Sequence, residues 1–403
     1  MVSRQALRHR IVIVGGGTAG ITVAARLRRA GQDDIAIIEP SATHDYQPLW
    51  TLVGGGRAPI SESRRREADV MPAGVRWLQD WAEEIDPETQ TVSTRSGVQV
   101  HYGALVVCPG IQLDWDAVPG LSDAIGHAGV SSVYSYETAP TMWELIRPLR
   151  RGTALFTIPS GAIKCAGAPQ KIAYLASDWW RRQGVLSNIH VILALPGDSF
   201  FGVPEFRAVL ERVVARYGID LRLKHELVEI RPAMREAVLI DRSHGSEQRV
   251  TIQYDILHAV PPQSAPDWIK RGPLSDGTPA GYIAVDKHTL QHLRYPTIFA
   301  LGYAGNTPNS KTGAAIRKQA PVVVKNLLAA LAGAPPAATY NGYASCPVVT
   351  ARNRMLLAEF DYSMRPAPSI PLINTAKERY DMWLLKRYGL PFLYWHGMLK
   401  ERM

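Results

Sequence analysis

The stretch that decides the fold is IVIVGGGTAGITVAARLRRAGQDDIAIIEP at residues 11–40. An apolar run, a glycine turn, a helical stretch and a second apolar run predict a βαβ unit. Gly15, Gly17 and Gly20 fit G-x-G-x-x-G, in which the glycines allow a tight turn, close phosphate approach and close helix packing. Glu39 closes the second run and can accept hydrogen bonds from ribose hydroxyls. The segment therefore predicts a dinucleotide site with its pyrophosphate at a helix N-terminus.

A second unit with different turn chemistry follows at residues 153–195. Its strand TALFTIP leads into the turn SGAIKCAGAP and the helix QKIAYLASDWWRRQ, without G-x-G-x-x-G. The next strand ends in Leu195-Pro196 with no acid to hold a ribose, which disfavours a nicotinamide site. The turn presents Cys165 instead, beside Lys164 and just before the expected helix N-terminus. We expect a lowered thiol pKa there, and sulfur chemistry becomes the leading hypothesis.

Two such units predict an α/β protein with two Rossmann-like, doubly wound domains and a C-terminal helical appendage. The apolar run YPTIFALG (295–302) is expected to return to the first sheet, while segments 219–231, 236–241 and 250–260 are expected to complete the second. The predicted limits are 1–114 and 285–331 for the discontinuous first domain, 115–284 for the second domain with Cys165 and no NAD site, and 332–403 for the C-terminal segment with Cys346.

Later turns favour FAD as the dinucleotide. Gly110 and Gly302 each end a strand in a turn that would lie along the pyrophosphate and ribityl chain. A helix is expected to begin near Lys311, so that Thr312 and Gly313 present its positive end to the flavin pyrimidine. Lys311 would add a full charge there, or be an ordinary surface lysine.

Composition limits the remaining classes. The chain has 403 residues and a formal net charge of +9, which favours anionic partners such as a phospholipid surface, or serves solubility alone. Three cysteines are too few for a disulfide scaffold, and none has zinc-ligand spacing. We expect no metal and no nucleic-acid partner, and interpret Cys108 as a small core residue. No signal segment or bilayer-spanning run is visible, so the compartment is interpreted as cytoplasmic, with membrane attachment open.

Several long and unusual stretches resemble type II sulfide:quinone oxidoreductases, and the likeness covers nearly the whole chain. They are HDYQPLWTLVGGG (44–56), GIQLDW (110–115), IKCAGAPQKIAYL (163–175), FFGVPEF (200–206), LHAVPPQSAPD (257–267), NSKT (309–312), YASCPVVTARNRMLLAEFDY (343–362) and PFLYWHGML (391–399).

The resemblance implies a monotopic, membrane-associated flavoenzyme that oxidises hydrogen sulfide to sulfane sulfur and passes electrons to quinone. The family's two cysteines, which flank one face of the isoalloxazine, match Cys165 and Cys346. The family's FAD contacts match Gly17, Thr18, Glu39, Gln47, Lys311 and Thr312. One departure is Tyr303, which follows Gly302 where the family usually has an Asp for a ribityl hydroxyl.

A mechanism follows from this resemblance as a hypothesis. Hydrosulfide attacks a Cys165–Cys346 link at Cys346 and leaves a persulfide there, and the Cys165 thiolate delivers two electrons to the flavin. Sulfite, a thiol or another sulfide then removes the sulfur as thiosulfate, persulfide or polysulfide. His258 is a candidate for proton transfer to quinone, although a purely structural histidine is equally compatible.

The C-terminal segment predicts a membrane-interface anchor. KERYDMWLLKRYG (377–389) has helical spacing, Gly389 and Pro391 are expected to break it, and PFLYWHGMLKERM (391–403) begins a second short helix. Trp383, Phe392, Tyr394 and Trp395 are assigned to quinone or the lipid interface. We predict peripheral attachment to the cytoplasmic face of a prokaryotic membrane. Ordinary core or dimer packing is the alternative, and a homo-oligomer is compatible with the sequence.

Three other functions stay open on the sequence alone. A type II NADH:quinone oxidoreductase would share the fold but requires a second phosphate loop. A soluble sulfide dehydrogenase serving a cytochrome subunit would require export. A non-catalytic FAD-binding protein finds support only in Tyr303.

Overall fold

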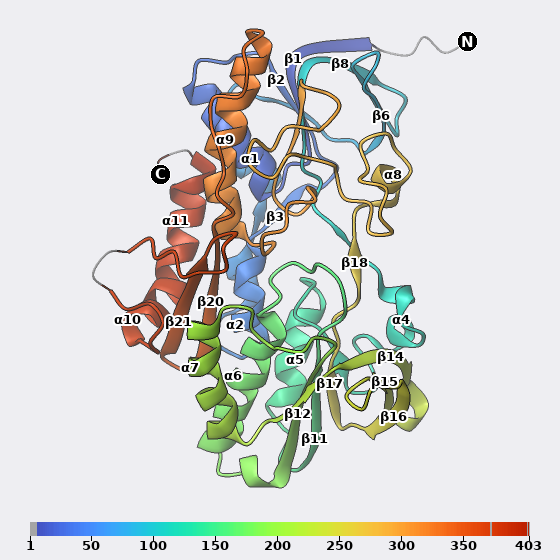
Figure 1. The fold of residues 1–403 in the computed structure, drawn as a ribbon, viewed down its shortest axis with the longest axis vertical. Coiled ribbons are helices and arrows are strands. Elements are labelled where there is room, and N and C mark those ends of the chain that lie inside the picture. Colours follow the sequence, from blue (N-terminus) through green and yellow to red (C-terminus); the bar gives the residue numbers. More distant parts are fainter. Residues whose placement is uncertain (1–5, 371–372, 401, 403) are drawn as a thin grey trace.

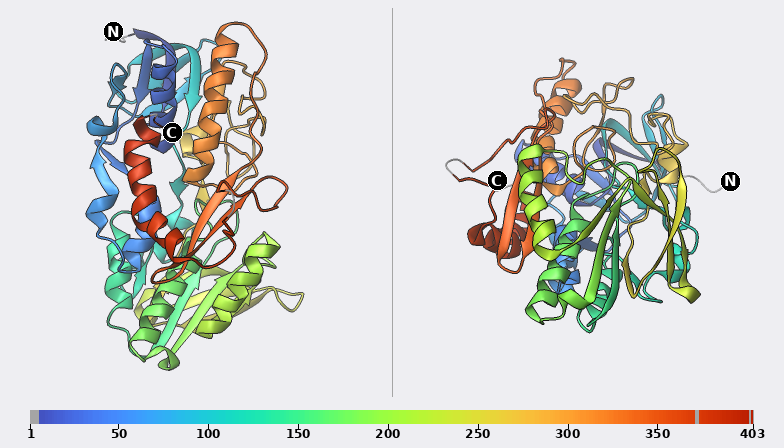
Figure 2. Two further views of the ribbon diagram at one scale, coloured as in Figure 1. Left: turned by 90° about the vertical axis from the view of Figure 1, so that its left-hand side faces the viewer. Right: turned by 60° about the horizontal axis from the view of Figure 1, so that its bottom comes forward.

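The computed structural model describes residues 6–370, 373–400 and 402. Two α/β units lie one above the other along the long axis of the molecule, and the C-terminal segment runs along one side of both (Figure 1). A second view shows α11 lying lengthwise beside the upper unit, with the hairpin β20–β21 between the two units (Figure 2).

The upper unit is built on a sheet of order β5-β2-β1-β8-β7-β6, in which β19 also pairs with β8. Its strands β1, β2, β5, β8 and β19 run parallel, and β6 and β7 are antiparallel additions. The pairing of β19 with β8 confirms that the late apolar run returns to the first sheet. The bounds are β1 (Ala6–Val14), β2 (Ile35–Ile38), β5 (Arg76–Leu78), β6 (Ala82–Asp86), β7 (Thr91–Thr94), β8 (Gln99–Val107) and β19 (Ile298–Ala300).

Two long helices, α1 (Thr18–Arg29) and α9 (Gly313–Leu331), begin at the carboxyl ends of these parallel strands. Thr312 caps α9 by accepting a hydrogen bond from the backbone N–H of Ala315. Both helices contribute to one buried apolar core with β1 and β2. Their N-termini therefore open at the same edge of the sheet, where open α/β sheets bind ligands.

The lower unit is a fully parallel sheet of order β10-β17-β11-β12-β13. Its bounds are β10 (Val130–Ser131), β11 (Gly152–Thr157), β12 (Ile189–Leu195), β13 (Asp220–Leu223) and β17 (Ile256–His258). The accompanying helices are α5 (Thr138–Ile146), α6 (Ala168–Arg182) and α7 (Pro204–Tyr217). Two Rossmann-like α/β units are thus present, and the limits at 114/115, 284/285 and 331/332 stay a proposal.

The prediction for the second sheet is confirmed only in part, because β13 and β17 join the parallel sheet but the strands between them do not. Residues 225–253 form a separate antiparallel sheet, β14-β15-β16, rather than completing the parallel one. The bounds are β14 (His225–Arg231), β15 (Glu236–Asp241) and β16 (Gln248–Gln253). The connections between these strands are short, and such strands pair antiparallel because a parallel addition needs a long crossover.

The C-terminal segment consists of the hairpin β20 (Ala344–Ala351) and β21 (Arg354–Phe360), then α10 (Tyr380–Leu384), a π-helical turn (Leu385–Gly389) and α11 (Leu390–His396). The prediction that Gly389 and Pro391 break the helix is wrong. Pro391 has no N–H to donate, and the Leu390 N–H bonds to the Leu385 carbonyl, so one wide turn joins the two helices.

The shorter elements are β3 (Thr43–Asp45), β4 (Arg64–Arg66), α2 (Trp50–Gly54), α3 (Glu67–Val70), β9 (Gln112–Leu113), α4 (Leu121–Ala124), β18 (Gln263–Ser264) and α8 (Asp267–Lys270). Across the described ranges, no helix combines the length and apolar character that crossing a bilayer requires.

Candidate active site

A cavity of about 540 Å³ lies where the two α/β units and the C-terminal segment meet. Its walls come from the N-termini of α1 and α9, the turn before α6, the hairpin β20–β21 and the helix α11. Elements that are far apart in the sequence thus converge on one enclosed space, which is typical of a cofactor or substrate site.

The glycine turn at the N-terminus of α1 forms a cradle open to this cavity. A Cβ on Gly20 would overlap the Gly15 carbonyl, and Gly15 itself has a φ of +101°, so neither position tolerates a side chain. Gly17 and Gly110 line the cavity, and a Cβ on either would meet nothing within 4 Å. The backbone is therefore bare where a pyrophosphate would approach, and the chain fits a dinucleotide.

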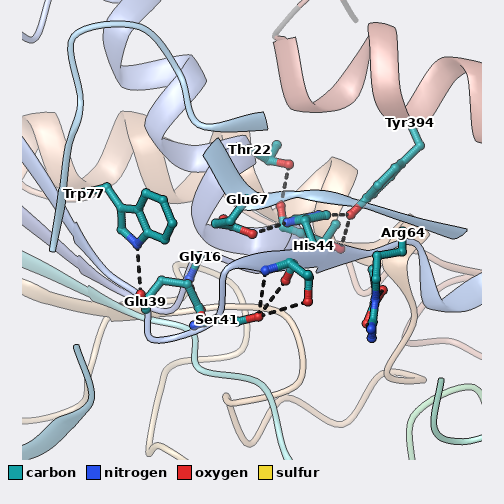
Figure 3. A network of polar contacts seen from close by, with 12 residues as sticks. Gly16, Thr22, Glu39, Ser41, His44, Arg64, Glu67, Trp77 and Tyr394 are labelled. Atoms are coloured by element: carbon teal, nitrogen blue, oxygen red, sulfur yellow. Dashed lines mark hydrogen bonds and ion pairs between the residues drawn. The ribbon is translucent and has the colours of Figure 1, made fainter. Parts of the chain in front are cut away.

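Glu39 lies beside this cradle, directly after β2 (Figure 3). Its carboxylate accepts hydrogen bonds from the backbone N–H groups of Gly16 and Ser41, each at 2.7 Å. Burial raises the pKa of Glu39, and the two backbone hydrogen bonds partly oppose that shift. The carboxylate also lines the cavity, in the position predicted for a ribose ligand.

A buried polar chain ties α11 to this cradle (Figure 3). The phenol of Tyr394 lies 2.7 Å from the Thr18 hydroxyl and 2.6 Å from Nε2 of His44. The other ring nitrogen of His44 lies 3.2 Å from the Glu67 carboxylate. Glu67, His44 and Tyr394 are all buried, and Thr18 begins α1. The C-terminal helix is thus fastened directly to the helix whose N-terminus faces the cavity.

Cys165 and Cys346, here called the thiol pair, come together from distant parts of the chain. Both are free thiols, and a hydrogen bond joins their side chains. Cys165 has a left-handed backbone (φ +50°), and its N–H donates to the Lys311 carbonyl at 2.9 Å. This strained turn brings the Cys165 thiol to the cavity wall. The corresponding turn of the upper unit, before α1, contributes Gly17 to the same wall.

Lys171, one turn into α6, supplies the charge at the thiol pair. Its ammonium donates to Sγ of Cys165 at 3.3 Å, and the residue is buried. The hydrogen bond from Cys346 and the charges of Lys171 and Lys386 hold the pKa of Cys165 well below its usual value, although burial opposes them. The pKa of Cys346 is raised well above its usual value by the same thiol–thiol hydrogen bond and by burial. Cys165 is therefore the thiolate and Cys346 the thiol.

Two further buried lysines surround the pair. Lys386, in the π-helical turn, donates to the Pro48 carbonyl at 2.7 Å, and burial and the charge of Lys171 lower its pKa to about 7. Lys164 donates to the Gln47 side chain at 2.8 Å and to the Tyr134 carbonyl at 3.2 Å, and burial lowers its pKa to about 8. The sequence predicted the lowered pKa of Cys165, but its main cationic cause is Lys171, which the sequence reasoning missed.

Most of the residues predicted to contact FAD line the cavity: Gly17, Thr18, Glu39, Gln47, Gly110, Tyr303, Thr312 and Gly313. Lys311 does not. Its ammonium donates to the carbonyls of Tyr303 and Gly305, at 2.9 and 2.7 Å, and lies 3.9 Å from the ring centroid of Tyr282. Burial lowers the pKa of Lys311 to about 7. Gly302, predicted to lie along the ribityl chain, donates its N–H to the Gln319 side chain at 2.9 Å.

The position of His258 disfavours its predicted role in proton transfer. The ring is buried in the lower unit, stacks on Phe156 and accepts a hydrogen bond from the Val133 N–H at 3.2 Å. Burial lowers its pKa to about 3, so the ring is neutral at physiological pH. It is not part of the cavity wall.

The aromatic residues of the C-terminal segment divide into two groups. Trp383, Tyr394 and Trp395 are buried in the core of the upper unit, and Tyr394 also lines the cavity. Phe392 is 64% exposed. It shares the surface of α10 and α11 with the other exposed apolar residues Tyr380, Leu384, Tyr388 and Leu393, here called the apolar face.

The cavity wall also contains apolar side chains and, besides Glu39, a second acid that is buried. The hairpin and the residues after it contribute the apolar residues Pro347, Leu357, Ile370, Leu385, Leu390, Leu393 and Met398. Leu393 belongs both to this wall and to the apolar face, so the cavity wall and the exposed surface share a residue. The acid is Glu359, which the sequence reasoning missed; its only signal is a carboxylate within the apolar strand RMLLAEF.

The chain is similar in sequence to known proteins over nearly its full length. The family model of pyridine nucleotide-disulphide oxidoreductases matches residues 9–315. The mitochondrial sulfide:quinone oxidoreductase of Mus musculus is 40% identical over 97% of this chain and 86% of its own. The mitochondrial sulfide:quinone oxidoreductase of Dictyostelium discoideum is 42% identical over 98% of this chain and 86% of its own.

A solved structure of a similar kind shows the same fold. The X-ray structure of the sulfide:quinone oxidoreductase of Aquifex aeolicus matches with a TM-score of 0.80, covering 98% of this chain and 92% of that one. Its sequence identity is 19%, so this likeness concerns the fold alone.

Proposed function

The chain belongs to the sulfide:quinone oxidoreductase family, and from this premise we propose that Cys165 and Cys346 are the redox pair of the enzyme. It is an FAD-dependent oxidoreductase that transfers two electrons from sulfide to quinone. The single observation that supports the assignment of the pair is their direct contact beside Lys171, where Cys165 and Lys171 line the cavity and Cys346 lies buried behind them.

The chain's residues fit FAD. Gly17 and Thr18 would hold the pyrophosphate at the N-terminus of α1, Gly15 provides the tight turn before them, and Glu39 would hold the ribose. Further along the cavity, Gln47, Gly110, Tyr303, Thr312 and Gly313 would surround the rest of the cofactor. Bound FAD supplies a two-electron carrier between the thiol pair and quinone.

The thiol pair handles the sulfur. In the oxidised enzyme Cys165 and Cys346 share a disulfide, and hydrosulfide attacks Sγ of Cys346. The S–S bond breaks, Cys346 becomes a persulfide, and Cys165 leaves as the thiolate that Lys171 and Lys386 stabilise. The lower thiol pKa of Cys165 makes it the better leaving group, which fixes Cys346 as the site of attack.

A small nucleophile then takes the sulfane sulfur from Cys346. Sulfite, a thiol or a second sulfide are the acceptor classes, and each releases Cys346 as a thiolate. Re-forming the disulfide gives up two electrons, which quinone finally accepts. These steps do not depend on the oligomeric state, so they are compatible with a homo-oligomer.

We propose that quinone binds against the apolar residues of the cavity wall and that the membrane lies against the apolar face. A lipid-soluble quinone would pass between the membrane and the cavity beside Leu393. The attachment is then peripheral, through an amphipathic surface. The relatives compared above carry the word mitochondrial in their names, which does not support the prediction of a prokaryotic cytoplasmic face.

The test is sulfide-dependent quinone reduction by Cys165→Ser and Cys346→Ser. Each variant is expected to bind FAD and to lose this activity, because either change removes one sulfur of the disulfide. Cys108→Ala is the matched control, since it removes the remaining thiol and leaves the pair intact. Near-wild-type rates in either serine variant would refute the assignment.

A further inference from the structure

We propose that Glu359, reached from solvent through Ser369, delivers the proton that quinone reduction takes from water. The inference rests on the proposed function, because it assigns a residue to the quinone half of that reaction. It identifies a catalytic acid outside the thiol pair, on the opposite face of the same hairpin.

The hairpin β20–β21 presents two chemically different faces. Cys346 pairs with Ala358, and both lie in the apolar core shared with α6. Ser345 pairs with Glu359, and their side chains line the cavity on the other face. Successive residues of a strand point to opposite sides, so Glu359 is separated from Cys346 by the thickness of this small sheet. The hairpin therefore directs Cys346 into the core and Glu359 into the cavity.

Glu359 is buried, yet its hydrogen bonds lead to the surface. The residue is 1% exposed. Its Oε1 accepts from the Tyr343 phenol and the Ser369 hydroxyl, both at 2.5 Å, and its Oε2 accepts from the Ser369 N–H at 3.1 Å. Ser369 is exposed. A single hydroxyl therefore connects bulk water to an acid that is itself part of the cavity wall.

The surroundings connect the Glu359 carboxylate to exchangeable protons and not to a fixed cation. All the groups that bond the carboxylate in the described part of the chain are hydroxyls or a backbone N–H, not cations. The nearest charges face Tyr343 instead: Arg317 donates to its phenol at 3.4 Å, and Lys318 lies 5.7 Å from its ring centroid. Leu357 and Ile370 line the same cavity and supply apolar surface, as the ring of a quinone would require.

The reaction demands such a proton. For hydrosulfide the balance is HS⁻ + quinone + H⁺ → S⁰ + quinol, with S⁰ held as sulfane sulfur. The substrate supplies the electron pair and one proton, and water must supply the other. The Glu359 carboxylate takes a proton that water supplies through the Ser369 hydroxyl, and passes it to a quinone oxygen as the electron pair arrives.

The experiment separates the two half-reactions of the FAD-loaded enzyme by anaerobic stopped flow. Glu359→Gln keeps the shape and removes the ionisable group. We expect flavin bleaching by sulfide to stay at the wild-type rate, while reoxidation by a short-chain ubiquinone analogue falls about 100-fold. Ferricyanide accepts electrons without protons, so it should reoxidise the variant at the wild-type rate. Glu359→Asp should recover part of the quinone rate.

The pH dependence distinguishes a proton donor from a structural residue. Any dependence of the wild-type quinone step on pH that a proton relay causes should be absent in Glu359→Gln. The titratable and charged groups facing this site are Tyr343, Arg317 and Lys318. Glu84→Gln, an exposed strand glutamate in β6, is the matched control and should keep the wild-type profile.

Two results would overturn the inference: quinone reduction by Glu359→Gln at the wild-type rate, or a parallel loss with quinone and ferricyanide. If Glu359→Gln does not fold, the exposed variant Ser369→Ala decides. This variant should reoxidise more slowly with quinone and at the wild-type rate with ferricyanide. Reoxidation of Ser369→Ala at the wild-type rate with both acceptors would overturn the proposal. Failure of the wild type to bleach with sulfide would instead contradict the proposed function.

Discussion

Lys171 donates a hydrogen bond to Cys165, and no sequence motif around this lysine predicts the contact. It lies on the buried side of α6, where burying a charged lysine costs desolvation free energy unless the lysine has an anionic partner. The Cys165 thiolate is that partner, and the pKa of Lys171 is raised by it and by Cys346 against the effect of burial. The lysine therefore stays charged throughout the physiological pH range, and its charge is present whenever Cys165 must leave as a thiolate.

Replacing this lysine should impair the sulfide half-reaction at every pH. In Lys171→Met the pKa of Cys165 rises, since the hydrogen bond and the charge are both lost, and we expect flavin bleaching by sulfide to slow about 100-fold. Lys325→Met, which removes an exposed helix lysine from α9, serves as the control. Unchanged bleaching in Lys171→Met would show that this ammonium does not stabilise the thiolate.

At the scale of elements, the apolar periodicity and the positions of Gly and Pro predicted those helices and strands that depend on their own segment alone. The strand–glycine–helix unit at residues 11–40, the helix after Lys311 and the helix with Pro169 in its first turn all form as expected. Two expectations failed because the deciding contacts are not local. Gly389 and Pro391 do not end the helix, since a π-helical turn absorbs the missing donor, and the strands of residues 225–253 pair with each other.

The continuity of α10 and α11 has a functional consequence. Because the helix does not break, its π-helical turn brings Lys386 to the Pro48 carbonyl and within electrostatic reach of the thiol pair. The same helix fastens Tyr394 to Thr18 and His44. The C-terminal segment therefore contributes to the cavity wall as well as carrying the apolar face.

Lys386 should impose a pH dependence on thiolate stabilisation. Its pKa of about 7 means that the ammonium is charged at pH 6, where it favours the Cys165 thiolate, and largely neutral above pH 8. Lys386→Met removes the charge at all pH values. The ratio of wild-type to variant rates of flavin bleaching by sulfide should therefore be large at pH 6 and approach one above pH 8. Taking the ratio cancels the ionisation of sulfide itself, and a ratio independent of pH would contradict this role.

At the scale of the whole molecule, the site was predictable where one stretch of chain carries it. The glycine cradle and Glu39 belong to one βαβ unit. The sequence alone also shows that Cys165 occupies a turn where a phosphate-binding loop would have glycine. Lys171, Lys386 and Glu359 were not predictable, because each is an ordinary polar residue within its own segment. Their roles arise from the meeting of α6, the hairpin β20–β21 and the C-terminal helices around one cavity.

The same architecture determines how membrane binding has to be tested. Deleting residues 377–403 would remove Lys386 and Tyr394 together with the exposed aromatics, so loss of activity would say nothing about lipid. Substitution of the apolar face leaves the buried contacts in place. Tyr380, Tyr388 and Phe392 are each more than half exposed and lie on α10, α11 and the turn between them.

We expect the combined variant Tyr380→Ser, Tyr388→Ser, Phe392→Ser to lose most of its co-sedimentation with liposomes, because aromatic side chains at the lipid interface supply much of the affinity of a peripheral helix. Flavin bleaching by sulfide should be unchanged, since these side chains are exposed on the outer surface of the C-terminal helices. The matched control replaces exposed apolar residues elsewhere, with Trp81→Ser, Met234→Ser and Leu293→Ser, and should sediment like the wild type. Equal liposome binding by both triple variants would mean that another surface meets the membrane, and quinone would then need an entrance other than the one beside Leu393.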